Sequence, residues 1–152
     1  MKSLGNATDC RAALDRIARI QPGARARWGR MSAHQMLCHL SDSFRLALGE
    51  RQASAASGPL QRTVVKWFAL NVPMRWPRGI PTRPEMEQGR GGTPPSDFAR
   101  DRADLSGVVE RFTAPDRRLD QYPHPLFGPL TDAEWLRWGY LHADHHLRQF
   151  GA

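Results

Sequence analysis

The stretch from 131 to 150, TDAEWLRWGYLHADHHLRQF, decides the fold. Thr131, with Glu134 three residues on, predicts a capping box that opens a helix. Positions four apart share one face of a helix, so His142 and His146 present their imidazoles side by side. Neutral imidazole is the commonest protein ligand for zinc and related divalent ions. The pair therefore predicts half of a metal site, whose third ligand must come from elsewhere in the chain.

His39 is the best candidate for the third ligand. It belongs to a predicted helix over 32–48, which Ser32 and Gln35 open with a second capping-box pattern and Gly49 ends. The apolar face of this helix follows from residues at helical spacing, namely Met36, Leu37, Leu40, Phe44 and Leu48. His39 lies on the edge of that face, where it could meet the imidazoles of another helix.

Two further long helices are predicted over 9–20 and 96–113, and the histidine helix extends over 131–149. A shorter helix is predicted over 60–70. A strand at 64–70 is a poorer alternative, because apolar and polar residues do not alternate regularly there. The segment 72–95 is rich in proline and glycine, which is typical of a functional loop or a crossover between distant helix ends. We expect an all-α protein.

Composition indicates one ordinary globular domain over 1–152, with 40% hydrophobic and 24% charged residues. The net charge of +7 is almost entirely arginine. These arginines are scattered and lack interleaved exposed aromatic residues, which argues against nucleic acid as a partner. No window reaches the length of a signal peptide core or a membrane span. Cys10 and Cys38 lack CxxC spacing, so we expect free thiols in a cytoplasmic protein without membrane partners.

The histidines admit other interpretations. The pair in the last helix could be a solvated face, and a zincin protease is not supported because Ala143 replaces the glutamate that the zincin motif needs. His145 points roughly 100° away from His146, so it is either a residue behind the ligands or a surface residue. His124, between two prolines, could reach a pocket mouth or simply belong to a turn. Trp138 is one turn before His142 and could be both core and pocket wall.

Two motifs resemble a known family. The stretch from Trp28 to Leu40, WGRMSAHQMLCHL, followed by the C-terminal HxxxH pair, resembles the DinB/YfiT-like superfamily of metal-dependent proteins. The further pattern HPLFG at 124–128, Glu134-Trp135 and HADHHLRQF at 142–150 is similar to one uncharacterised subfamily of that group. The resemblance covers nearly the whole chain.

The resemblance implies a four-helix bundle in which residues 50–95 form a long crossover carrying the extra short helix. It also implies a divalent metal, Zn or Ni, on His39, His142 and His146, and a homodimer. Characterised relatives include a maleylpyruvate isomerase and several S-transferases that use a low-molecular-weight thiol. A thiol is therefore a second cofactor that the resemblance suggests.

These observations favour a metal-dependent enzyme of hydrolase or thiol-transferase type that acts on a small molecule. Three protein ligands leave a coordination position open for water or thiol, which the cation would acidify. We expect neighbouring side chains to orient the imidazoles through hydrogen bonds, the candidates being Gln35, Asp42, Ser43, Asp144, His145 and Gln149. The alternative is a non-catalytic helical bundle that binds a small molecule or a partner. A carboxylate or histidine facing the metal as a general base, Asp42 or His124, would favour the enzyme.

Overall fold

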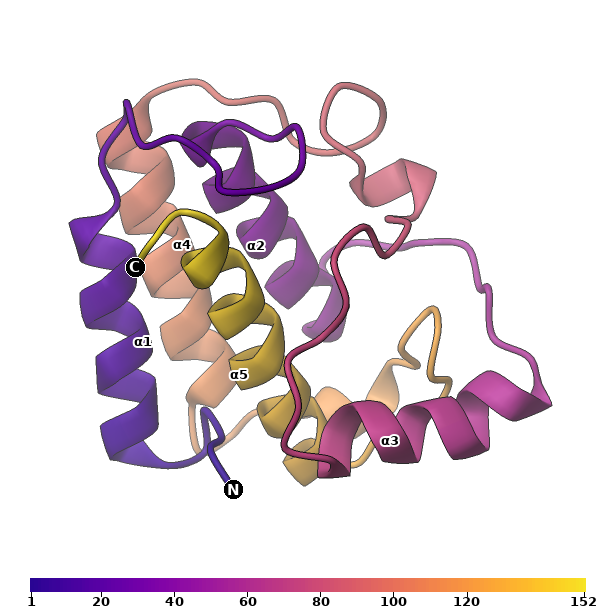
Figure 1. Ribbon diagram of the computed structural model, residues 1–152. Coiled ribbons are helices and arrows are strands. Elements are labelled where there is room, and N and C mark those ends of the chain that lie inside the picture. The colour runs from indigo at the N-terminus through magenta and orange to yellow at the C-terminus, as the bar shows by residue number, and fades with distance from the viewer.

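The computed structural model describes residues 1–152 and contains five α-helices and no β-strand (Figure 1). The helices are α1 (Ala7–Arg19), α2 (Ala33–Ala47), α3 (Lys66–Asn71), α4 (Phe98–Thr113) and α5 (Asp132–Gln149). A π-helical turn, Gln61–Val65, runs directly into α3, and short 3-10 turns occupy Pro84–Met86 and Leu119–Gln121. The predicted all-α class is confirmed, and the alternative strand at 64–70 does not form. None of the helices has the length and apolar composition needed to cross a bilayer.

The helices begin where local capping places them. Ser32 with Gln35, and Thr131 with Glu134, form the two expected capping boxes. The Asp97 side chain accepts a hydrogen bond from the Arg100 amide at the start of α4. Helix α1 begins two residues earlier than predicted because the Asn6 side chain accepts from the amides of residues 8 and 9. The sequence thus located the four long helices to within two residues.

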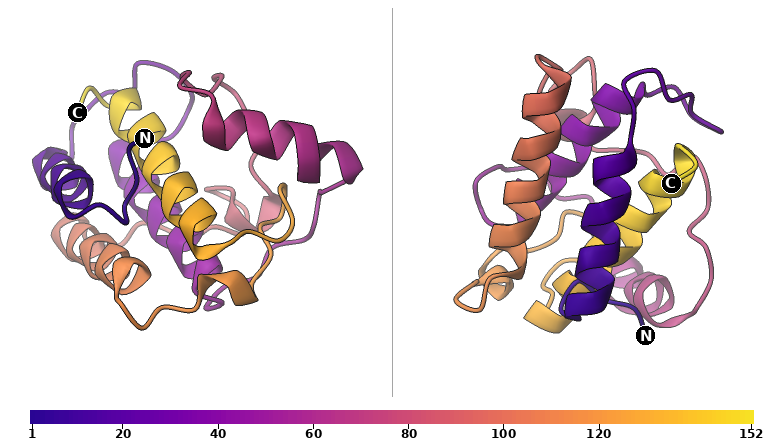
Figure 2. Two further views of the ribbon diagram at one scale, coloured as in Figure 1. Left: turned by 90° about the horizontal axis from the view of Figure 1, so that it is seen from below. Right: turned by 90° about the vertical axis from the view of Figure 1, so that its left-hand side faces the viewer.

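The four long helices pack against one another, with α2 on α4 and α5, and α1 on α4 and α5 (Figure 2). Helices α2 and α4 run side by side in the same direction, so the chain between them must return along the bundle. This return is the long crossover of residues 48–97. Helix α3 lies within it, outside the four-helix group and against α5. Of the α3 residues only Leu70 is buried, because the helix touches the rest of the molecule along one edge.

Helices α2, α4 and α5 approach closely where Gly139 sits in α5. A Cβ atom at this position would lie 2.8 Å from the ring of Phe112 and 3.0 Å from that of Phe44. Both rings are fully buried and pack on each other with centroids 4.9 Å apart. The missing side chain therefore lets α5 settle against the aromatic core, which fixes the position of its histidines relative to α2.

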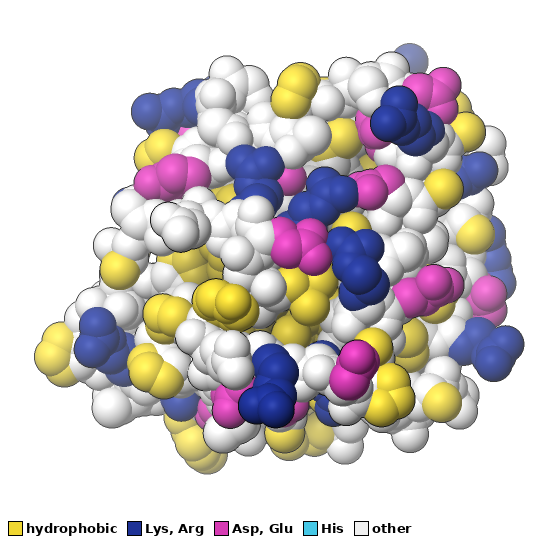
Figure 3. Space-filling view, turned by 180° about the vertical axis from the view of Figure 1, so that it is seen from behind, with side chains coloured by type: hydrophobic (Ala, Val, Ile, Leu, Met, Phe, Trp, Pro, Cys, Tyr) yellow, Lys and Arg dark blue, Asp and Glu magenta, His cyan; other side chains and the backbone are white.

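Charged side chains of both signs are interspersed on the face opposite to the view of Figure 1 (Figure 3). Ion pairs join α2 to α4, including Arg45 with Asp104 at 2.6 Å. Arg111 pairs with Glu50 at 3.0 Å just beyond the end of α2. Exposed pairs of this kind contribute little to stability, about 0–1 kcal/mol each. Their mixture leaves no single-sign tract on this face.

Candidate metal centre

His39 from α2 and His142 and His146 from α5 converge in one cluster. One ring nitrogen from each of the three lies within 4.8 Å of those of the other two. His39 Nε2 and His142 Nε2 are 3.2 Å apart. Two ligands of a tetrahedral zinc ion with bonds of ~2.05 Å are separated by about 3.3 Å. The spacing of these two nitrogens therefore fits a shared divalent ion.

The proton positions on two of the rings follow from their partners. His39 Nδ1 lies 3.3 Å from the Met86 carbonyl oxygen, which can only accept, so this nitrogen donates. The Gln149 amide Nε2 donates to the Trp28 carbonyl at 2.6 Å, which turns its Oε1 toward His146 Nδ1 at 2.9 Å. His146 Nδ1 is therefore also a donor. Both rings are left with the Nε2 lone pair free for a metal.

The third ring is only partly satisfied by the protein. His142 Nδ1 is buried and has no hydrogen-bond partner. Its Nε2 faces the Nε2 lone pair of His39, so without a cation these two nitrogens can share only one proton. A divalent ion bound by both uses both lone pairs. The donor set and the 3.2 Å spacing of the two Nε2 atoms fit a metal ion of the zinc class.

Burial keeps the three imidazoles neutral. His39 and His146 are only 5% and 9% exposed. Burial lowers the pKa of His39, and burial together with the neighbouring imidazoles lowers the pKa of His142 and His146 further. Neutral imidazoles offer their lone pairs at neutral pH without competition from protons.

His142 is the partly exposed member of the cluster, and two tryptophans cover its ring. Trp138 packs on it with centroids 4.7 Å apart, and Trp76 lies at 6.3 Å with a tilt of 32°. Trp76 also lines a surface cavity of about 180 Å³, together with Leu141, Asp144 and Arg148. Trp76 therefore contacts both the His142 ring and this cavity, although none of the three histidines lines the cavity. Trp76, in the irregular crossover, was not predicted as a site residue because no periodic pattern places it.

Several side chains expected to orient the imidazoles have other partners. Gln35 was predicted to do so, but its Oε1 accepts from the Ser32 amide, because the capping box uses the same side chain. Asp42 bonds Arg51 and Thr93, and Asp144 bonds Arg16 and Arg148.

Ser43 and His145 also make no hydrogen bond to a ligand ring. The Ser43 hydroxyl bonds the His39 carbonyl within the helix. His145 is buried and packs edge-on against Trp28 and His146. Gln149 alone of these six candidates bonds a ligand ring. The other partner, the Met86 carbonyl, is a backbone group without a sequence signal.

His124 lies in an aromatic cluster rather than at a pocket mouth. Its ring stacks on Phe127 at 4.7 Å and contacts Trp135 and Trp138. Its Nδ1 accepts hydrogen bonds from the amides of residues 126 and 127 at 3.1 Å, which closes the turn. Burial lowers its pKa to about 3. His124 is therefore a neutral structural acceptor behind Trp138.

This burial predicts a pH-dependent difference in stability between the wild type and His124→Asn, whose amide oxygen keeps an acceptor near the two amides. The unfolded chain protonates His124 below about pH 6.5, whereas the folded protein does not until about pH 3. Stability is therefore lost as the pH falls from 6.5 toward 3. Between pH 7 and 5 the wild type should lose about 2 kcal/mol more than the variant in urea unfolding. Equal losses in the two proteins would contradict the buried, neutral state.

Gln149 gives a second prediction. Replacing Gln149 by leucine removes the acceptor for His146 Nδ1–H and should weaken zinc binding about 10-fold, because partners of ligating histidines typically have effects of that order. Gln149→Glu is the matched control, since it keeps an acceptor oxygen and should retain affinity within a few-fold. Competition with a chromophoric chelator measures both. Equal affinities of the leucine and glutamate variants would exclude an orienting role.

The fold and this cluster define an all-α protein with a three-histidine candidate metal site between two of its packed helices. Comparison with protein-family models then places the chain more narrowly. Residues 2–152 match the family described as "Protein of unknown function (DUF1569)", and the chain belongs to that family. Searches of curated proteins and of solved structures gave no match.

Proposed function

We propose that His39, His142 and His146 bind one divalent cation, zinc or nickel, in the working protein. The observation that carries this proposal is the convergence of three neutral imidazoles from α2 and α5, two of them buried and the third, His142, partly exposed. Two of them are held by donor bonds at Nδ1, as ligating histidines commonly are. The proposed metal would replace the hydrogen bond between the Nε2 atoms of His39 and His142, whose 3.2 Å separation suits two ligands of one ion.

We further propose that the chain is a DinB/YfiT-like metal-dependent enzyme acting on a small molecule. The parallel pair α2 and α4, joined by a long crossover, agrees with the bundle topology that the resemblance implies. The histidines come from the second and the last of the four long helices, as that resemblance requires. A bound cation with three protein ligands would keep a coordination position for water or a thiol and lower its pKa.

Between the two reaction types, the surroundings of the site favour thiol transfer over hydrolysis. A hydrolase would gain from a protein base beside the cation, and the candidates were Asp42 and His124. Asp42 is engaged by Arg51 and Thr93, and His124 is enclosed by aromatic rings. Transfer from a metal-held thiolate needs no such base, because the nucleophile is already ionised.

The same absence of a base supports a second candidate function. A non-catalytic bundle that binds a small molecule in the cavity lined by Trp76, Leu141 and Arg148 would not need acid–base groups. Turnover of an electrophile with a low-molecular-weight thiol separates the candidates. The enzyme should consume thiol only in its metal-loaded form, whereas the binding module should bind metal without turnover.

The first test is elemental analysis of untagged protein after exposure to Zn²⁺ or Ni²⁺ and removal of free ion. We expect the wild type to hold one more equivalent of metal than His39→Ala measured in parallel. His124→Asn serves as the control, because it changes a buried histidine outside the cluster and should hold as much metal as the wild type. Equal metal content in the wild type and His39→Ala would overturn the proposal.

A further inference from the structure

A second group of side chains with metal-ligating atoms lies between α2 and α4. His34 and Cys38 are one turn apart on the same face of α2, and α4 supplies Asp101. His34 Nε2 lies 2.7 Å from Asp101 Oδ2, and Cys38 Sγ lies 3.7 Å from the same oxygen. All three donor atoms lie within 4.8 Å of one another. An imidazole, a thiol and a carboxylate thus converge on one point.

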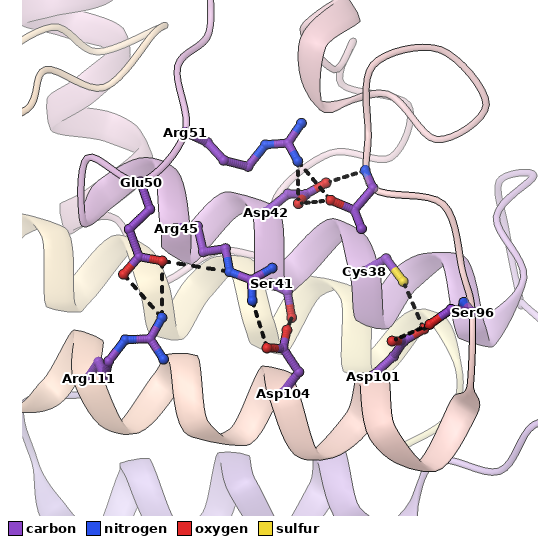
Figure 4. A network of polar contacts seen from close by, with 11 residues as sticks. Cys38, Ser41, Asp42, Arg45, Glu50, Arg51, Ser96, Asp101, Asp104 and Arg111 are labelled. Carbon is purple, nitrogen blue, oxygen red and sulfur yellow. Dashed lines mark hydrogen bonds and ion pairs between the residues drawn. The ribbon is translucent and has the colours of Figure 1, made fainter.

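Neighbouring groups hold two of these side chains in place. The Ser96 amide donates to Asp101 Oδ2 at 2.9 Å, and the Ser96 hydroxyl donates to Oδ1 at 3.0 Å (Figure 4). The His34 ring packs edge-on against Phe98, with centroids 5.2 Å apart. Groups that support ligands in this way are characteristic of built metal sites, because they fix the direction of each donor before the ion arrives.

Burial at this cluster is graded. Cys38 is 4% exposed, whereas the side chains of His34 and Asp101 are 21% and 17% exposed. The sulfur therefore lies at the bottom, and the other two donors line an opening to solvent. The partial exposure of these two side chains gives an ion a route from solvent to the donors.

We propose that His34, Cys38 and Asp101 form a second cation site, for a zinc-class ion, distinct from the three-histidine cluster. Zinc takes nitrogen, sulfur and carboxylate oxygen in tetrahedral sites, with bonds of about 2.0–2.3 Å. Donor atoms bound that way lie ~3.3–3.6 Å apart, and the two measured separations of 2.7 and 3.7 Å need only small side-chain shifts to reach it. Cys38 binds as the thiolate, and its proton passes to solvent.

The two sites do not share space although Cys38 and His39 are adjacent in sequence. Consecutive helical residues point about 100° apart. Cys38 therefore faces α4 while His39 faces α5, as their contacts with Asp101 and His142 show. The second site also differs chemically from the three-histidine site, because it contains a sulfur ligand. Thiolate selects zinc and cobalt over magnesium and calcium. This difference allows each site to be observed separately.

Cobalt titration of the full chain tests the proposal. Thiolate bound to Co²⁺ gives an intense near-ultraviolet charge-transfer band, which a site with only histidine ligands does not give. The titration is done in a His39→Ala/His142→Ala background, so that the result does not depend on the three-histidine site. We expect the band to saturate at one equivalent of Co²⁺ and to disappear on addition of Zn²⁺.

Cys10→Ser is the matched control for Cys38→Ser, because Cys10 is the other free cysteine and lies on α1, away from the cluster. The band should persist in the first variant and vanish in the second. His34→Gln, which keeps the thiol, should lower Co²⁺ affinity at least about 10-fold and keeps the test decisive if Cys38→Ser fails to fold. Absence of the band in the background protein, or its loss on changing Cys10, would overturn the proposal.

Discussion

Replacing His142 by leucine is expected to weaken Zn²⁺ or Ni²⁺ binding at the three-histidine site by more than about 100-fold, since even second-sphere partners of ligands have effects of 10–100-fold. In the metal-free state the variant should be about as stable as the wild type, because loss of the unpaired Nδ1 offsets loss of the hydrogen bond to His39 Nε2. His142 Nδ1 is buried without a partner, and such a group destabilises the fold by about 1–3 kcal/mol. Leucine removes that group and still packs against Trp76 and Trp138.

His145→Leu is the matched control for this prediction. Its Nδ1 is also buried without a partner, and it lies in the same helix, one residue before a ligand. We expect it to gain stability in the metal-free form, because it makes no hydrogen bond that leucine would remove, while it keeps its affinity for metal. Calorimetric titration gives the affinities, and urea unfolding in the presence of a chelator gives the stabilities. Unchanged binding in His142→Leu, or equal loss in both variants, would refute the ligand assignment.

Replacing Asp42 by asparagine is expected to destabilise the protein by about 3 kcal/mol, because breaking a buried ion pair leaves its partners unpaired. The Asp42 carboxylate is completely buried. It accepts from Arg51 Nη1 at 2.9 Å, from the Thr93 amide at 2.7 Å and from the Thr93 hydroxyl at 2.6 Å (Figure 4). Arg51 also donates to the carbonyls of Glu85 and Gly91. These contacts tie the crossover segment 85–93 to α2.

The same segment carries the Met86 carbonyl that holds His39 Nδ1–H. Loosening it should therefore lower metal affinity as well as stability, by about 10-fold. Asp104→Asn is the matched control. Asp104, in α4, also bonds two residues of α2, Arg45 and Ser41, but its side chain is 38% exposed. That variant should change stability by less than about 1 kcal/mol and leave metal binding unchanged. A similar effect of both substitutions on affinity would contradict the positioning role of Asp42.

Local rules explain how much of the fold was predictable. The capping boxes at Ser32 and Thr131 and the spacing of His142 and His146 depend on residues within four positions of each other. The same local rules act on Gln35, which was expected to orient an imidazole and bonds the Ser32 amide through its Oε1. A polar side chain three residues after an N-cap has a partner at hand, and this local bond excluded a more distant one.

The sequence by itself determined the helical class, the ends of the long helices and which faces carry histidine, because helix formation and capping follow from neighbours along the chain. Only the tertiary structure decided which groups complete the two clusters. The Met86 carbonyl, the Trp76 ring and the contacts of Asp42 with Thr93 all involve the irregular crossover. The pairing of Cys38 with Asp101 depends on how α2 and α4 pack. These partners are 47 to 66 positions away from the α2 or α5 residues they meet, and periodicity does not encode contacts at such separations along the chain.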